Sequence, residues 1–282
     1  HVAVRRQRQM CIRDRPVKCF YMRKADRSRS IKLDGGINFR DLGGYKNIES
    51  RTVRWRKIFR SGHLADISDS DTNELQRFGL TEIHDFRRES EQIQSPTGVL
   101  PFRIIDDYQI SIGDISKFWE FLSSGRLTSG SAHELVVNSY RQCVTDVVAP
   151  FSRFLKGIAR NSNNASLFHC SAGKDRTGMA AALLLSCLDV PRETIVQDYL
   201  LTQKYYNPEK LIKIIESHLR DADVHSWERS WLIPYVSVHE QNINAFLDSI
   251  DLQFGSMKNF IQGELEVSAE ELSELQNNFL EG

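Results

Sequence analysis

Residues 169–178, with the sequence HCSAGKDRTG, constrain the fold of this chain more than any other stretch. A short apolar run at 165–168 precedes them, and a longer apolar run at 179–185 follows. This order predicts a buried strand, a tight loop and a buried helix. A loop that enters a helix N-terminus presents unpaired backbone N–H groups and the positive end of the helix dipole, which together suit an anion.

Inside the predicted loop, Cys170 is followed six positions later by Arg176. Thiolate is the nucleophilic form of cysteine, and a helix N-terminus stabilises it. A planar guanidinium matches two oxygens of a phosphate. The alternative is a small core cysteine, which is common near helix starts, but Gly173 and Thr177 complete a set that favours a reactive site. The predicted phosphate-binding residues are Ser171, Ala172, Gly173, Lys174, Asp175 and Arg176.

The pattern His-Cys-x5-Arg-Thr resembles the signature of cysteine-dependent protein tyrosine phosphatases. Its Gly-Lys-Asp-Arg version resembles the bacterial and fungal subgroup, some of whose members also act on phosphoinositides. The resemblance implies an α/β fold of the cysteine-phosphatase type, with a central, mainly parallel sheet flanked by helices and a helical C-terminal part. It also implies a phosphocysteine intermediate, with no metal and no other cofactor.

Three further stretches resemble motifs of the same family. Residues 38–45, NFRDLGGY, are similar to an opening motif that lies beside the catalytic loop, so Arg40 and Asp41 are expected to support the site. Residues 85–91 match the family's Asp-Leu-Arg-x-x-x-Glu with Phe86 in place of leucine, and residues 198–202 resemble its Asp-Tyr-Leu-x-Ser/Thr. For Asp85 and Arg87 we expect structural bracing rather than chemistry.

The resemblance implies roles for the loop residues. Cys170 would attack phosphorus, and Arg176 would bind two phosphoryl oxygens more tightly as charge spreads in the transition state. Thr177 would hydrogen-bond the sulfur and help it leave in the second step. His169 would orient the loop rather than act as a base.

The reaction also needs an acid that protonates the leaving alcohol. A predicted strand over residues 99–105 ends in Asp106 and Asp107, and the resemblance implies an aspartate shortly after this strand. Asp107 is the first choice and Asp106 the second, whereas Asp175 inside the loop is the rival. Each of the three is also compatible with a solvated turn residue.

Lys174 bears on the substrate. A second cation inside the predicted phosphate-binding loop would favour polyanions such as phosphoinositides, whereas a lysine paired with Asp175 would not. Known lipid phosphatases also carry a basic residue directly after the cysteine, and here that position is Ser171. Phosphotyrosine proteins are therefore the expected partners, and phosphoinositides are the alternative. A sulfurtransferase or a non-catalytic phosphate-binding pseudophosphatase would not need the complete set of loop residues.

Composition limits the remaining functions. Residues 1–30 carry a net charge of +8 in a chain of zero net charge, so the remaining 252 residues sum to about −8, which does not suggest nucleic-acid binding. We expect the first 30 residues to be a disordered basic arm, a targeting peptide or foreign sequence, and a phosphatase domain to span 31–282.

The cysteines and the apolar runs bear on location. No apolar run is long enough for a transmembrane helix. The cysteines are odd in number and scattered without zinc-type pairing, which predicts a reducing, cytoplasmic compartment: Cys11, Cys19, Cys143, Cys170 and Cys187.

Apolar periodicity predicts several helices outside the loop region. Residues 131–161 are expected to be helical, and a further helix is expected over 236–254. A helix over about 72–78 would take its N-cap from Asp69, Ser70 or Asp71. Ser268 and Glu271 form a capping box for the last helix.

Overall fold

The computed structural model describes residues 27–112, 115–161 and 164–282. The prediction for residues 1–30 falls almost entirely outside these ranges and stays a prediction. Among the described residues, Arg29 already contacts the domain, because its Nη1 donates to the Asp41 carbonyl at 2.7 Å.

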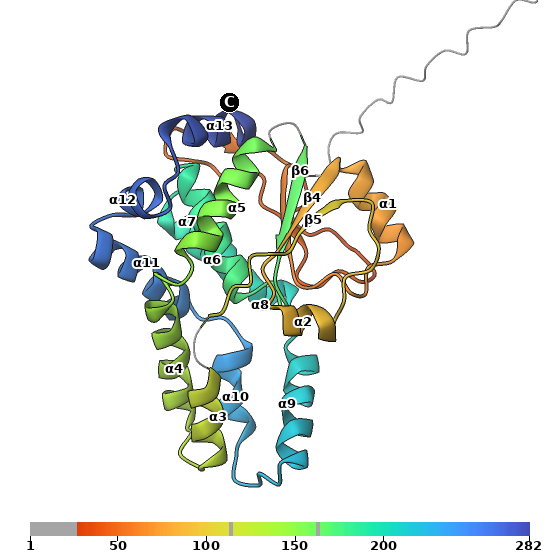
Figure 1. Cartoon of the computed structure of the whole chain (residues 1–282), viewed down its shortest axis with the longest axis vertical. Helices are drawn as coiled ribbons and strands as arrows, with labels where there is room; N and C mark the ends of the chain where they lie inside the picture. Colours follow the sequence, from red (N-terminus) through yellow and green to blue (C-terminus); the bar gives the residue numbers. More distant parts are fainter. Residues whose placement is uncertain (1–26, 113–114, 162–163) are drawn as a thin grey trace, which may run out of the picture.

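A five-stranded sheet forms the centre of the fold, in the order β1-β3-β6-β4-β5 (Figure 1). Only the pairing of β1 with β3 is antiparallel; the other three pairings are parallel. A small antiparallel sheet joins β2 to β7 near the end of the chain. The strands are β1 (Arg40–Asp41), β2 (Thr52–Val53), β3 (Ile58–Ser61), β4 (Leu80–Asp85), β5 (Arg103–Ile105), β6 (Ala165–His169) and β7 (Leu280–Glu281).

Helices cover both faces of the large sheet, which confirms the α/β class (Figure 1). On one face, Leu75 of α1 packs with Phe59, Ile83 and Leu167 of the strands. On the other face, α5, α6, α7, α11 and α13 build the main core against residues such as Ile58 and Phe168. No helix among the described residues is long and apolar enough to cross a membrane.

The helix bounds are as follows. They are α1 (Asp69–Arg77), α2 (Glu89–Gln94), α3 (Ile115–Ser123), α4 (Ser129–Gln142), α5 (Val148–Arg160), α6 (Asp175–Cys187), α7 (Arg192–Leu200), α8 (Thr202–Tyr205), α9 (Glu209–Asp221), α10 (Arg229–Val236), α11 (Glu240–Phe254), α12 (Met257–Asn259), the π-helix η1 (Phe260–Glu264) and α13 (Ala269–Phe279).

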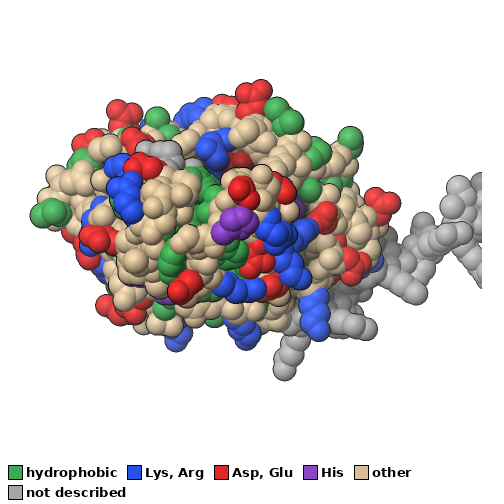
Figure 2. All heavy atoms as spheres, turned by 90° about the horizontal axis from the view of Figure 1, so that it is seen from below, with side chains coloured by type: hydrophobic (Ala, Val, Ile, Leu, Met, Phe, Trp, Pro, Cys, Tyr) green, Lys and Arg blue, Asp and Glu red, His purple; other side chains and the backbone are tan. Residues whose placement is uncertain are grey.

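A group of helices hangs below the sheet and has a core of its own (Figure 1). We call it the helical appendage; it consists of α3, α4, α9 and α10. Its core includes Phe118, Leu122, Ile212, Leu232 and Val236. Seen from below, the molecule shows Lys and Arg side chains interspersed with Asp and Glu, and hydrophobic side chains between them (Figure 2).

Three predictions about helices need correction. The predicted helical stretch over 131–161 is two helices, α4 and α5, because α4 packs on α10 and α11 whereas α5 packs on α13, so the chain must turn between them. The helix expected over 236–254 begins only at Glu240, since Val236 ends α10. The N-cap of α1 is Ser68, and Asp71 completes its capping box. At α13 the predicted capping box of Ser268 and Glu271 is present.

Candidate active site

The loop of residues 170–174 joins the carboxyl end of β6 to the N-terminus of α6, at the centre of the parallel sheet. Gly173 has a φ of +65°, and a Cβ atom added there would lie 2.3 Å from the Ser61 carbonyl oxygen. Only glycine therefore fits at this position, both for backbone conformation and for space. The loop presses directly on the end of β3.

The carbonyl groups of the loop are held from outside. Ser171 O accepts from the backbone N–H of His63 at 3.0 Å. Gly173 O accepts from Asn38 Nδ2 at 2.8 Å and from Arg60 Nη2 at 3.0 Å. By contrast, no described part of the chain accepts a hydrogen bond from the backbone N–H groups of residues 171–176. A set of unpaired donors at a helix N-terminus is an anion site.

A buried ionic network fixes the groups that hold this loop. Asp198 of α7 pairs with Arg60 at 2.5 Å and with Arg40 at 3.4 Å, and it accepts from Tyr45 Oη at 2.9 Å. Burial opposes ionisation of Asp198, but the two guanidinium groups lower its pKa to about 2. Arg40 also donates to Asn38 Oδ1 at 2.6 Å. Arg40 thus contacts Asn38, which in turn donates to the Gly173 carbonyl, and a supporting role for Arg40 stays a prediction.

Asp41 has a different surrounding. Its carboxylate accepts from the backbone N–H of Gly43 at 2.7 Å and pairs with Arg56 at 3.0 Å. It shapes the turn after β1 and does not touch the loop of residues 170–174. Farther along, Arg87 pairs with Asp85 at 2.7 Å and donates to Ser95 O at 2.6 Å, so this pair braces the turn between β4 and α2.

Glu91 of α2 lies against the loop, a contact that its sequence position alone does not predict. Its two carboxylate oxygens accept from Nη1 and Nη2 of Arg176, each at 2.6 Å, and one of them accepts from Ser171 Oγ at 2.5 Å. Burial opposes its ionisation, but the contact with Arg176 holds the pKa of Glu91 well below its usual range. The sequence signal that could have indicated this contact is the place of Glu91 at the end of the Asp-x-Arg-x-x-x-Glu motif.

The bidentate contact fixes the plane of the Arg176 guanidinium. Burial alone would lower the pKa of Arg176, but Glu91 and the Cys170 sulfur raise it. The guanidinium is therefore a permanent cation beside the cysteine, and its Nε is left without a partner among the described residues. Cys170 itself is almost fully buried.

The Lys174 side chain does not point freely into the phosphate-binding loop. Its side chain is buried, and its ammonium donates to the Tyr235 carbonyl of α10 at 2.5 Å and lies 3.5 Å from the Asp175 carboxylate. Of the two arrangements considered above, this is the paired one. The lysine also ties the loop to the helical appendage.

The candidate acids lie in different environments. Asp175 accepts from Tyr140 Oη at 2.5 Å, and Tyr140 in turn lies 2.7 Å from Tyr199 Oη. Burial, followed by the nearby Asp175, raises the pKa of Tyr140, so its hydroxyl stays a donor. The Asp107 side chain is exposed and pairs with Arg153 at 2.7 Å.

A small pocket opens above Arg176. It has a volume of about 170 Å³, with Glu91, Asp175 and Arg176 among its polar wall residues. Its apolar wall includes Ile110, Ile112, Phe118, Leu135 and Tyr235, most of them from the helical appendage. Asp107 is not part of this wall. The pocket therefore combines anion recognition with an apolar slot.

His169 directly precedes the cysteine at the end of β6, and Thr177 lies in the first turn of α6. His169 Nδ1 lies 3.3 Å from the Cys170 carbonyl oxygen, and its Nε2 lies 3.7 Å from Asp85. The Thr177 hydroxyl is buried and has no hydrogen-bond partner in the described part of the chain. Its bond to the sulfur stays a prediction.

The burial of His169 predicts a pH dependence of stability. Burial, only partly offset by Asp85, lowers the pKa of His169 to about 4, so the ring is neutral at pH 7. The unfolded chain then binds more protons between its ordinary pKa of about 6.5 and pH 4. The free energy of unfolding should therefore fall as the pH drops through this window, by about 2–3 kcal/mol at pH 4.5 from His169 alone.

Urea unfolding of the wild type and of His169→Gln at pH 7 and pH 4.5 measures this share. The loss of unfolding free energy between pH 7 and pH 4.5 should be smaller in the variant than in the wild type. His63 and His239, whose pKa values are also lowered by burial, account for part of the loss that the variant still shows. An equal loss of unfolding free energy in the two proteins would mean that His169 takes up its proton without cost in the folded state.

Comparison with known proteins agrees with this geometry. The model of a family described as the tyrosine phosphatase family matches residues 31–281. The chain belongs to this family. A cysteine in a loop of free N–H groups, with an arginine at the helix start, is typical of such phosphatases, and the chain is accordingly a protein-tyrosine phosphatase, a hydrolase of phosphoric monoesters.

Named relatives of this tyrosine phosphatase are bacterial. A provisionally named tyrosine-protein phosphatase of Cupriavidus necator is 28% identical over 261 residues, which cover 89% of both chains. The triple specificity protein phosphatase PtpB of Mycobacterium tuberculosis is 29% identical over 60% of this chain and 67% of its own length. A tyrosine-protein phosphatase of Nostoc commune is 31% identical over 52% of this chain and 48% of its own length.

Proposed function

We propose that this tyrosine phosphatase hydrolyses phosphotyrosine in proteins at the loop of Cys170 and Arg176. The observation that carries the proposal is the set of unpaired backbone N–H groups of residues 171–176 around a buried cysteine, with Arg176 fixed beside it. Such preorganised donors stabilise the charge that develops on the phosphoryl oxygens in the transition state.

The proposed chemistry has two steps. The Cys170 thiolate attacks phosphorus, the bond to the phenolic oxygen breaks, and the leaving oxygen takes a proton from an acid. A water molecule then attacks the phosphocysteine, the bond between sulfur and phosphorus breaks, and the acid regains its proton. Arg176 and the loop N–H groups hold the phosphoryl oxygens throughout, and Thr177 would donate to the departing sulfur.

For the acid we propose Asp175 in preference to Asp107 or Asp106. Asp175 borders the pocket above Arg176, whereas Asp107 pairs with Arg153 and does not line it. Asp175→Asn should lower kcat about 10²-fold or more and remove the basic limb of the pH–rate profile. Asp107→Asn is the matched control and should leave both unchanged; the reverse pattern would return the role to Asp107.

The pocket supports one substrate class. Its apolar wall suits the ring of a phosphotyrosine, and the contacts of Lys174 with Tyr235 and Asp175 leave no free ammonium for a second phosphate. Both features support an aryl monophosphate over a phosphoinositide. The name of the Mycobacterium tuberculosis relative includes the words triple specificity, so more than one substrate class is tested, the phosphoinositides among them.

Rates on a phosphotyrosine peptide, a phosphoinositide and β-glycerophosphate would decide between these classes. We expect kcat/KM for the peptide to exceed that for the phosphoinositide by about tenfold or more. Ile112→Ser, which changes only the apolar wall, should lower kcat/KM for the peptide by about tenfold and leave β-glycerophosphate unaffected. A faster reaction with the phosphoinositide would favour the lipid phosphatase.

We also propose a cytoplasmic location. The three cysteines in the described part of the chain, Cys143, Cys170 and Cys187, are all free thiols, which fits a reducing compartment. Fractionation of the source cells with an antibody against the chain would test this, and recovery in the medium or an oxidising compartment would contradict it.

A further inference from the structure

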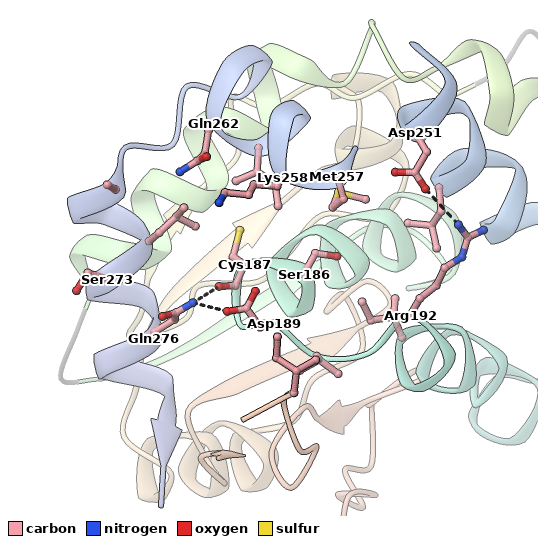
Figure 3. Close-up of a pocket in the computed structure, with 17 residues that line it drawn as sticks. Ser186, Cys187, Asp189, Arg192, Asp251, Met257, Lys258, Gln262, Ser273 and Gln276 are labelled. Carbon is pink, nitrogen blue, oxygen red and sulfur yellow. Dashed lines mark hydrogen bonds and ion pairs between the residues drawn. The ribbon is translucent and has the colours of Figure 1, made fainter. Parts of the chain in front are cut away.

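A second, larger cavity lies at the end of α6 that is remote from the phosphate loop. It has a volume of about 570 Å³, against about 170 Å³ for the pocket above Arg176. Ser186 and Cys187 at the C-terminus of α6 form part of its wall, together with residues of α11, α12, η1 and α13 (Figure 3). A volume of this size is typical of sites for small molecules.

Apolar side chains form about half of the wall of this cavity, beside polar and charged ones. The apolar side chains include Val190, Ile195, Leu247, Met257, Ile261 and Leu272. Ile48 also borders the cavity, although 73% of its side chain is exposed to solvent. Burying such apolar surface under a bound molecule is favourable by about 25 cal/mol for each Å² removed from water. The cavity therefore favours a ligand with an apolar body.

Some of the charged side chains around the cavity have close partners. Arg192 pairs with Asp248 and, at 3.4 Å, with Asp251. Asp189 accepts from Gln276 Nε2 at 2.8 Å.

The Lys258 ammonium makes no hydrogen bond or close ion pair within the described chain, and its charge reaches Asp189, where it partly offsets the burial and the Glu49 charge that raise the pKa of that carboxyl. In Figure 3 it lies on one side of the cavity with Met257, and Asp189 lies on the other side with Gln276. An ammonium without a close partner, at the rim of a cavity with an apolar wall, is suited to one anionic group.

The backbone beside Lys258 is unusual as well. α12 runs directly into the π-helix η1, which contributes Ile261 and Gln262 to the wall. Short π-helical turns are rare and occur frequently at functional sites. This turn brings the apolar side chain of Ile261 and the polar rim of α12 to the same cavity.

We propose that this cavity is a binding site for an amphipathic monoanion, an alkyl carboxylate whose chain lies on the apolar wall and whose carboxylate pairs with Lys258. The site is separate from the phosphate loop and does not depend on the reaction proposed above. Its ligand would be a medium-chain fatty acid or a molecule of the same chemistry.

Calorimetric titration of the full chain with dodecanoate, kept below its micelle concentration, tests the proposal. Saturating inorganic phosphate is present throughout, so that the phosphate loop is occupied and cannot bind the carboxylate. We expect one bound dodecanoate per chain. Dodecyltrimethylammonium, which has the same alkyl chain and the opposite charge, should bind at least about tenfold more weakly.

Two surface variants locate the site. Lys258→Gln should weaken dodecanoate binding about tenfold, and Ile48→Ser should weaken it several-fold because it removes apolar wall. Both residues are exposed, so neither change should lower the unfolding temperature. Lys213→Gln, an exposed lysine on α9, is the matched control and should bind as the wild type does.

The proposal fails if dodecanoate does not bind, or if the cationic surfactant binds as tightly. It also fails if the affinity is unchanged in Lys258→Gln or in Ile48→Ser. Activity assays are not needed for any of these outcomes, so an error in the assignment of the catalytic residues would leave the test intact.

Discussion

Cys170→Ser is expected to lower kcat for an aryl phosphate by about 10⁴-fold or more, because the serine hydroxyl is not ionised near pH 7 and cannot replace the thiolate as nucleophile. The loop N–H groups and Arg176 remain in the variant, so it should still bind a phosphotyrosine peptide. Initial rates with a metal chelator present, together with a binding titration, measure both effects.

Cys187→Ser provides the control for this substitution. Cys187 is also buried but lies at the opposite end of α6, where burial raises the pKa of its thiol to about 12. The Cys187→Ser variant should hydrolyse the aryl phosphate at the wild-type rate. Activity that persists in Cys170→Ser, or wild-type activity that the chelator abolishes, would refute the cysteine mechanism. A wild-type chain that binds the peptide without hydrolysing it would be a pseudophosphatase.

Asp198→Ala should be the most destabilising of the changes considered. Asp198 is buried and pairs with both Arg40 and Arg60, which are buried as well. Removing one partner from a buried ionic network leaves uncompensated charge and costs about 3–5 kcal/mol. Arg60 would also lose its fixed position below Gly173 O, so activity should fall even at temperatures where the variant stays folded.

Asp248→Ala is the matched control for the loss of stability. Asp248 also pairs with an arginine, Arg192, but 67% of its side chain is exposed. Exposed pairs contribute about 0–1 kcal/mol, so urea unfolding should show little change. Similar losses in the two variants would mean that burial of the Asp198 network carries no special cost.

The loop region was largely predictable because its information is local. The strand at β6, the turn at Gly173 and the helix after it follow from residues next to one another in the chain. The capping box of α13 is local in the same way. The position of Arg40 near the loop was predictable for another reason, since its motif resembles one that lies beside the loop in the family.

Distant contacts could not be predicted in this way. The break between α4 and α5 depends on which helices each of them packs against. Glu91 contacts Arg176, which lies 85 residues later in the chain, and this contact requires α2 to lie beside the loop. The position after a predicted strand and the family resemblance favoured Asp107 as the acid, whereas the wall of the pocket includes Asp175.

By itself, the sequence determined the chemistry at the centre of this protein: a cysteine, a glycine that alone fits its turn, and an arginine at a helix start, which together indicate a phosphate-binding loop. Only the tertiary structure decided how those groups are used. It turns the loop carbonyls outward to Asn38, Arg60 and His63, and it ties Lys174 to the appendage. Backbone conformation depends on neighbouring residues, whereas the direction of a charged side chain depends on partners that folding brings from far along the chain.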